Sequence, residues 1–194
     1  MVLDVVALRE RLRRPLPASS IYGDDDAGRL AAAVTAASVL VPIVTHAELT
    51  VLFTQRTKQL RHHSGQVSFP GGRREPSDAT PEFTALRETQ EEIGLAPERI
   101  EVLARMPEYL TRTGYRVTPV IGLVAPPLVL SPDSREVEEV FEVPLAFLLD
   151  PANHQREARE LMGRTVAFWV MQYDRHRIWG ATAGMLVNLY RMLA

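Results

Sequence analysis

The segment TPEFTALRETQEEIG, residues 80–94, carries the most specific structural signal in this sequence. Thr80 is a favourable N-cap, Pro81 suits the first helical position, and Gly94 suits the left-handed residue that ends a helix. The pattern therefore predicts a helix over residues 81–93. On one side of it lies a mostly apolar stripe, which we expect to face a core: Phe83, Leu86, Gln90 and Ile93.

Three glutamates share another face of this helix, because Glu88, Glu91 and Glu92 stand at positions i, i+3 and i+4. Like charges at this spacing repel by about 0.2–0.5 kcal/mol per pair. The negative end of the helix dipole adds a cost of roughly 0.3–1 kcal/mol per charge. Two explanations are open for the helix alone. The carboxylates bind a divalent cation such as Mg²⁺ or Mn²⁺, or they form a solvated acidic face with Arg87 as a counter-ion.

The preceding segment RHHSGQVSFPGG, residues 61–72, favours the first explanation. Gly71 and Gly72 have no Cβ, so their backbone can approach a ligand closely. A pair of glycines is weak evidence by itself, because it more often marks a simple bend. Beside a helix with three crowded carboxylates, it is strong evidence for a binding loop and favours a divalent cation at this site.

Composition narrows the range of functions. The chain has 194 residues, 46% hydrophobic and 24% charged, and its net charge is −2. These values are typical of a globular protein. The net charge is far from the basic excess of a general nucleic-acid binder. The absence of cysteine excludes disulfides and thiolate metal sites. No apolar run is long enough for a membrane span, and the first residues lack the pattern of a secretory signal, so we expect a cytoplasmic protein.

Hydrophobic periodicity predicts the remaining elements. Helices are expected at about residues 2–13 and 183–193. Strands are expected at residues 37–44 and 50–54, which form a hairpin, at 98–104 and 117–124, and in a second hairpin at 165–172 and 177–179. No linker or repeat is visible, so residues 1–194 are expected to form one α/β or α+β domain.

Residues 72–95 resemble the Nudix box of nucleoside-diphosphate-linked hydrolases, G-x5-E-x7-R-E-U-x-E-E-x-G-U, in which U is a bulky apolar residue. The matching residues are Gly72, Arg87, Glu88, Glu91, Glu92, Gly94 and Leu95. Counted from Gly72, the first glutamate of the pattern falls at Asp78, and the box is one residue longer than usual.

Segments outside the box are similar to those of one subgroup, the coenzyme A pyrophosphatases. In this subgroup the longer box with an aspartate at this place is usual. The similar segments are residues 52–57, Arg61, Gly65, residues 69–72, residues 113–119 and residues 136–145.

The resemblance implies a Nudix fold, in which helices sandwich a mixed β-sheet and the box forms a loop, a helix and a loop. It also implies Mg²⁺-dependent hydrolysis of coenzyme A, and of its oxidised or acylated forms, to adenosine 3′,5′-bisphosphate and 4′-phosphopantetheine or its derivative. Mn²⁺ is an alternative ion.

We carry the family's roles over to the matching residues. Glu88, Glu91 and Glu92 are the expected metal ligands, together with the Gly72 carbonyl, and Arg87 is expected to position the loop or a carboxylate. Glu136 and Glu139 are candidate general bases. The candidates for substrate binding are Arg56, Arg61, Gly71, Gly72, Tyr115 and Arg116.

Two alternatives stay open. The chain could hydrolyse another dinucleotide, such as ADP-ribose, NADH or a diadenosine polyphosphate, or it could be a Nudix-fold binding module without catalysis. The first is disfavoured by the segments before the box and the second by the intact glutamates. The expected partner is a small molecule, and not a nucleic acid or a membrane.

Overall fold

The computed structural model describes residues 3–14, 34–58, 64–161 and 163–194. The helices are α1 (Val5–Leu12), α3 (Pro81–Ile93), α4 (Leu145–Leu148), α5 (Ala181–Leu193) and the 3₁₀ turns η1 (Pro97–Arg99) and η2 (Pro151–Asn153). The strands are β1 (Thr35–Val44), β2 (Thr50–Arg56), β3 (Val67–Ser68), β4 (Gly71–Arg73), β5 (Ile100–Arg105), β6 (Tyr109–Leu110), β7 (Tyr115–Val124), β8 (Val137–Pro144), β9 (Gln155–Leu161), β10 (Arg164–Tyr173) and β11 (His176–Trp179).

The centre of the main sheet is a parallel pair of strands, β1 and β7. Their register runs without interruption from Thr35 opposite Tyr115 to Val44 opposite Val124. β2 pairs antiparallel with β1 and with β8, β5 pairs antiparallel with β7, and the short strands β3, β4 and β6 join the same sheet. Both faces of β1 and β7 are covered along most of their length, which explains their nearly continuous apolar sequences.

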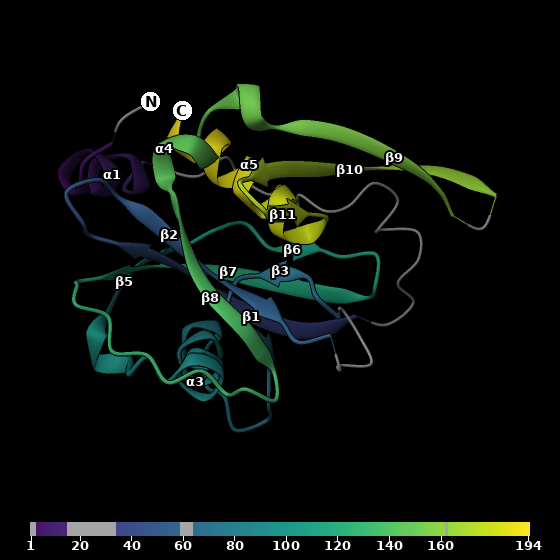
Figure 1. The fold of residues 1–194 in the computed structure, drawn as a ribbon. Helices are drawn as coiled ribbons and strands as arrows, with labels where there is room; N and C mark the ends of the chain where they lie inside the picture. Colours follow the sequence, from purple (N-terminus) through teal and green to yellow (C-terminus); the bar gives the residue numbers. More distant parts are fainter. Residues whose placement is uncertain (1–2, 15–33, 59–63, 162) are drawn as a thin grey trace.

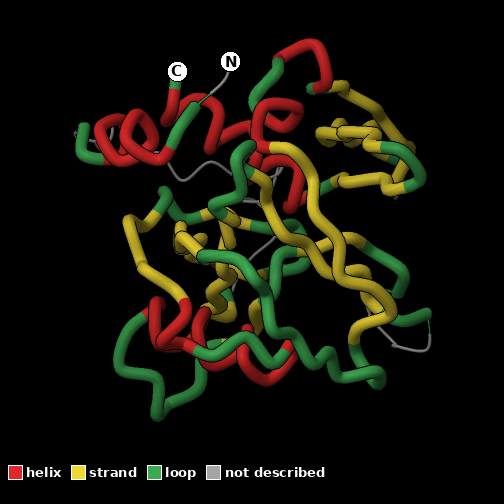
Figure 2. Tube along the Cα trace, turned by 60° about the vertical axis from the view of Figure 1, so that its left-hand side comes forward, coloured by secondary structure: helices red, strands yellow, loops and turns green. Residues whose placement is uncertain are grey.

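The main sheet lies between two layers (Figure 1). Helix α3 packs on one face. The other face carries α1, α5 and a second antiparallel sheet in the order β11-β10-β9. The tube in Figure 2 shows the same arrangement, with helices on opposite sides of the strands. The predicted fold, a mixed sheet sandwiched between helices, is confirmed.

Side chains of the main sheet alternate between two cores. Leu40 and Val44 of β1 point towards α3, where they pack with Ala85 and Ile93. Val41, Ile43 and Phe53 point to the opposite face and pack in a larger core with α5 residues such as Leu186 and Leu189. Burying these two sets on opposite faces fixes the register of β1 against its neighbours, because a slip of one residue would exchange them.

Most predicted elements are confirmed, with small changes at their ends. The structure places α3 at the predicted residues, with Thr80 Oγ1 accepting from the Phe83 amide at 3.2 Å and Gly94 at φ 71°. The N-terminal helix is shorter than predicted because Asp4 caps it, accepting from the Ala7 amide at 2.8 Å. The C-terminal helix begins two residues early. Both predicted hairpins form.

Two longer strands, β8 and β9, escaped the sequence prediction. In β8 several residues are only half-buried, so its apolar signal is weak. In β9 every residue from 155 to 160 is exposed. The hydrophobic pattern could not reveal a strand whose faces are both in solvent.

The predicted apolar stripe of α3 is confirmed for the buried Ile93 and the partly buried Leu86, but it is wrong for Phe83 and Gln90. Phe83 is 52% exposed and Gln90 is exposed, whereas the helix buries Ala85, Thr89 and Glu92 beside Ile93. The helix is therefore rotated relative to the expected orientation. The carboxylate of Glu92 and the hydroxyls of two threonines are buried, whereas Phe83 and Gln90 point to solvent.

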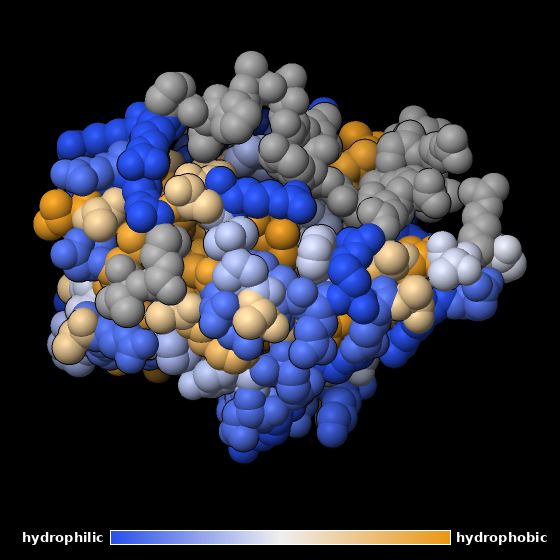
Figure 3. Space-filling model, turned by 90° about the horizontal axis from the view of Figure 1, so that it is seen from above, coloured by the Kyte–Doolittle hydropathy of each residue, from blue (hydrophilic) through white to orange (hydrophobic). Residues whose placement is uncertain are grey.

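The surface on the side of α1, α5 and the second sheet is mostly hydrophilic, with apolar side chains scattered between polar ones (Figure 3). Among the described helices, none combines the length and the apolar character needed to cross a membrane.

Candidate active site

Strand β4 brings backbone unusually close to α3. Gly71 has φ 148°, and a Cβ at this position would overlap the Ser38 carbonyl oxygen of β1. A Cβ at Gly72 would lie 2.5 Å from Glu88 Oε2 of α3. The two glycines therefore let the strand fit between β1 and the acidic side of the helix.

Glu92 is the most buried of the three box glutamates, with 6% of the residue exposed. Its Oε2 accepts a hydrogen bond from the Gly71 amide at 3.2 Å, and its Oε1 lies 3.4 Å from Arg56 Nη1. Burial raises the pKa of Glu92 to about 7, and repulsion from Glu136 and Glu88 adds to this, while the Gly71 amide and Arg56 act in the opposite direction.

Glu88 faces Gly72 and is half-buried, while Glu91 is exposed. Burial raises the pKa of Glu88, and the charges of Glu91 and Glu136 contribute to the increase although Arg87 opposes it. The Glu91 carboxylate turns to Arg87, with Oε2 3.0 Å from Nη1. The three glutamates therefore do not share one face of α3 as expected. Glu88 and Glu92 lie against β4, whereas Glu91 points to solvent.

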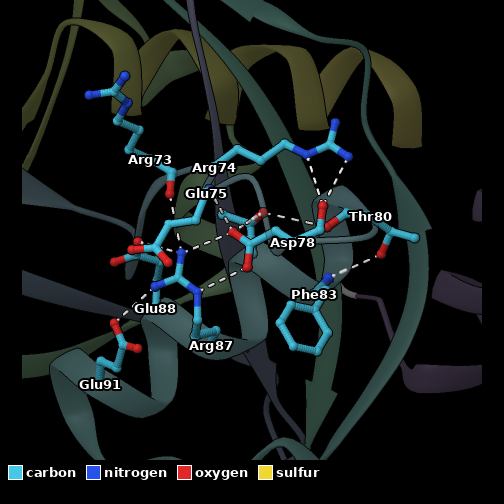
Figure 4. A network of polar contacts seen from close by, with 10 residues as sticks. Arg73, Arg74, Glu75, Asp78, Thr80, Phe83, Arg87, Glu88 and Glu91 are labelled. Carbon is cyan, nitrogen blue, oxygen red and sulfur yellow. Dashed lines mark hydrogen bonds and ion pairs between the residues drawn. The ribbon is translucent and has the colours of Figure 1, made fainter.

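Arg87 lies at the centre of the polar network in Figure 4. Its Nε and Nη2 donate to the two carboxylate oxygens of Asp78 at 3.1 and 3.0 Å. Nη2 also lies 2.9 Å from Glu88 Oε1 and donates to the Arg73 carbonyl at 3.2 Å. One guanidinium therefore connects the loop after β4 to two glutamates of α3. These are contacts through which Arg87 can hold the loop or a carboxylate in place.

Asp78 takes the place of the first glutamate of the box pattern. Its side chain is fully buried, and besides Arg87 it accepts from the Glu75 amide at 2.9 Å and from Thr84 Oγ1 at 3.0 Å. The bidentate contact with Arg87 is the largest cause that holds the pKa of Asp78 well below its usual range. The residue therefore stays ionised, and the extra residue of the box is accommodated in the loop.

The two candidate general bases lie on different faces of the main sheet. Glu136 precedes β8, and its Oε2 is 3.7 Å from Arg56 Nη2, on the same side as Glu92 and Glu88. Glu139 lies within β8 on the opposite face. There its carboxylate contacts Arg175 and lies 3.2 Å from Nε2 of the buried His176. The structure thus brings Glu136 to the box glutamates and keeps Glu139 away from them.

Only some of the predicted substrate-binding residues lie close to the box glutamates. Arg56 contacts Glu92 and Glu136, so it acts here as a counter-charge to carboxylates. A cavity of about 630 Å³ lies beside Glu88 and is lined by Ala36, Arg73, Arg74, Glu75, Pro76, Asp78 and Glu88. Arg116 is paired with Ala36 in the parallel register, which places it near one end of this cavity. Tyr115, the preceding residue of β7, points to the opposite face of the sheet and is 38% exposed. Arg61 lies outside the described residues.

Within residues 3–14, 34–58, 64–161 and 163–194, no three acidic or histidine side chains already stand close enough to hold a metal ion. The donor set nevertheless suits a hard divalent cation. Burial, with a smaller contribution from repulsion by Glu136, raises the pKa values of Glu88 and Glu92, and all three carboxylates are oxygen donors.

The sequence analysis did not identify two residues that hold Asp78 and its loop in place. Arg74 donates to the Asp78 carbonyl at 3.0 Å and to the Ala79 carbonyl at 3.1 Å, which holds the loop. Thr84 donates to Asp78 from the buried face of α3. Its position three residues before Arg87 was the available signal, because residues i and i+3 share a helix face.

Comparison with known proteins agrees with this geometry. The NUDIX domain family model matches residues 34–165. The uncharacterized Nudix hydrolase NudL of Klebsiella pneumoniae is 41% identical over 153 residues, which cover 79% of this chain and 80% of the relative. The NudL protein of Escherichia coli is 39% identical over 153 residues, which again cover 79% of this chain and 80% of the relative. The chain belongs to the Nudix family. It is a Nudix hydrolase, and such enzymes generally use divalent metal ions such as Mg²⁺.

Solved Nudix structures share the fold at low sequence identity. A MutT/nudix family protein from Enterococcus faecalis has a TM-score of 0.51 and 15% identity, covering 96% of this chain and 68% of its own. The binary complex of a C. elegans Ap4A hydrolase has a TM-score of 0.50 and 19% identity, covering 57% of this chain and 80% of its own.

We expect Asp78→Asn to lower the free energy of unfolding by about 3 kcal/mol, because it leaves the half-buried Arg87 guanidinium without its bidentate carboxylate. Urea denaturation at pH 7 measures the change. Glu101→Gln is a matched control, since it removes the carboxylate of an exposed pair with Arg9 and should have a much smaller effect. Equal losses in the two variants would contradict a structural role for the Asp78–Arg87 pair.

Glu92 should make the stability of the metal-free Nudix domain depend on pH. With a pKa of about 7 when folded and the ordinary value of 4.5 when unfolded, the folded state binds more protons between these values. Raising the pH through this window therefore destabilises the protein. In the presence of a chelator, the melting temperature of Glu92→Gln should fall less between pH 5 and 8 than that of the wild type.

Glu82→Gln is the control for this measurement. Arg105 lowers the pKa of Glu82 to about 2, so its contribution to stability is lost only in more acidic solutions. This variant should keep the wild-type slope between pH 5 and 8. A Glu92→Gln profile parallel to the wild type would show that Glu92 does not titrate in this range.

Proposed function

We propose that this protein hydrolyses the diphosphate bond of coenzyme A, and of its oxidised or acylated forms. The products are adenosine 3′,5′-bisphosphate and 4′-phosphopantetheine or its derivative. The observation that carries this proposal is the set of residues around the box that resemble the coenzyme A pyrophosphatases. Residues 52–57 include most of β2, and residues 69–72 lead into β4. Asp78 accepts two hydrogen bonds from the Arg87 guanidinium.

The position of these segments supports the proposal. β2 supplies Arg56 to Glu92, and β4 supplies the amide of Gly71 to the same carboxylate. The segments that distinguish the subgroup thus contact the residues of the box itself, where differences in sequence can affect the choice of substrate. The cavity beside Glu88 offers space for a part of the substrate next to the carboxylates.

We further propose that Glu88, Glu91 and Glu92, with the Gly72 carbonyl, hold Mg²⁺ or Mn²⁺. When bound, such an ion polarises phosphoryl oxygens and lowers the pKa of a bound water molecule. Glu92 is held towards the site by the Gly71 amide and Glu88 by Arg87. Glu91 would join them if its carboxylate gave up its contact with Arg87.

Glu136 is the preferred general base. It lies on the same side as the box glutamates, whereas Glu139 is engaged by Arg175 and His176 on the other face. From this position the Glu136 carboxylate accepts the proton of the attacking water, and Arg56 balances the charge around it. Arg116, at the end of the cavity, is available for contacts with the rest of the substrate.

With Mg²⁺ present, we expect the purified protein to cleave coenzyme A faster than ADP-ribose, NADH or a diadenosine polyphosphate. Separation of the products by chromatography should yield adenosine 3′,5′-bisphosphate. Consumption of ADP-ribose with intact coenzyme A would replace the proposed substrate by another dinucleotide. Binding of these compounds without turnover of any of them would indicate a non-catalytic module.

Glu136→Gln should lower kcat by about a hundredfold or more if Glu136 is the general base, because general base catalysis contributes at least this much. Glu139→Gln is the matched control, since it changes a glutamate of the same strand region that contacts other groups. Its kcat should stay within about twofold of the wild type. A comparable loss in both variants, or in neither, would reject this assignment.

A further inference from the structure

Strand β9 has an open edge and two exposed faces. It is the outer strand of the β11-β10-β9 sheet and pairs only with β10 among the described strands. All of its residues from 155 to 160 are exposed. Figure 1 shows the β9–β10 hairpin extending beyond the main sheet, with β9 on its outer side. A long open edge exposes amide and carbonyl groups that can pair with another strand.

The sequence of β9, QREAREL, is self-complementary in charge. When two copies pair antiparallel over the whole strand, the two-fold axis passes through Ala158. Arg156 then lies opposite Glu160 of the second copy, and Glu157 lies opposite Arg159. Residues directly opposite each other point to the same face of a sheet, so each of these pairs can form a cross-strand ion pair.

Neighbouring registers do not have this property. A shift of one residue in one direction places Arg156 opposite Arg159 of the second copy, and a shift in the other direction places Glu157 opposite Glu160. Like charges directly opposite each other are destabilising. The register with full overlap is thus the one that matches all four charged residues.

Three charged side chains of β9 contact side chains of the neighbouring strands β10 and β11. The Arg156 guanidinium lies over the Trp169 ring, 4.7 Å from its centroid, and Arg159 lies over Trp179 at 5.8 Å. Arg177 Nη2 is 2.5 Å from Glu157. These contacts orient the side chains on the two faces of the hairpin, which reduces the conformational entropy lost on association.

We propose that the protein forms a two-fold symmetric dimer through antiparallel pairing of β9 with β9 of a second copy. The two three-stranded sheets join into one continuous sheet, with β9 and its symmetry mate at the centre. This is an isologous interface, in which the same strand contributes both sides. The hydrogen bonds of the backbone hold the dimer together, and the charge pattern sets its register.

Sedimentation equilibrium with two charge-reversal variants tests the interface. Arg159→Glu places two glutamates opposite each other at two positions, and Glu157→Arg does the same with arginines. Each variant alone should raise the dimer dissociation constant at least about tenfold. Arg13→Glu, at an exposed position at the end of α1, is the control for a charge change and should leave the dimer intact.

Mixing the two variants gives the decisive result. In the heterodimer, positions 157 and 159 are both acidic in the Arg159→Glu chain and both basic in the Glu157→Arg chain, so every cross-strand pair joins opposite charges. We expect the mixture to associate as tightly as the wild type, and added salt to weaken both. A loss of dimer caused by damage to the fold would not be reversed by mixing.

Ala158→Cys tests the register independently, since the protein has no other cysteine. At the two-fold axis the two Cβ atoms lie within reach of a disulfide, so mild oxidation should link the dimer. A wild type that stays monomeric at about 0.1 mM would overturn the proposal. A dimer whose dissociation constant is unchanged in both charge-reversal variants would overturn it as well. The same holds for a dimer in which Ala158→Cys does not cross-link.

Discussion

The close approach of β4 to α3 is the constraint on which the site depends. The strand passes between β1 and the helix, where side chains on Gly71 and Gly72 would overlap Ser38 and Glu88. In return, the Gly71 amide points at Glu92 and binds its carboxylate. The backbone amide thus donates a hydrogen bond that a further side chain would otherwise have to donate. As a result, the acidic face of the helix can be buried against a sheet.

Electrostatic compensation around this contact comes from two arginines. Arg87 ties Glu88 and Glu91 to the buried Asp78, and Arg56 reaches Glu92 and Glu136 from the next strand. The compensation is incomplete, since burial and mutual repulsion still raise the pKa values of Glu88 and Glu92. A site in this state favours an additional positive charge, which is the physical basis for placing a divalent cation there.

The second sheet has a separate role in the architecture. It covers the opposite face of the main sheet and engages Glu139 through Arg175 and His176, so this carboxylate contributes to packing between the layers. Its outer strand carries charge on both faces and little apolar surface. Such a strand does not need burial within the monomer, and its alternating charges suit a copy of itself.

Local chemistry and spacing were enough to predict α3 with its caps, the two hairpins and the box residues, because these signals lie within a few residues of one another. The rotation of α3, the division of Glu91 from Glu88 and Glu92, and the separation of Glu136 from Glu139 follow from contacts between distant segments. Glu139 lies within β8 and faces the second sheet, whereas Glu136 lies just before the strand and contacts Arg56 beside the box glutamates. Periodicity along one strand cannot show which face meets which layer, since that depends on how helices and sheets pack in three dimensions.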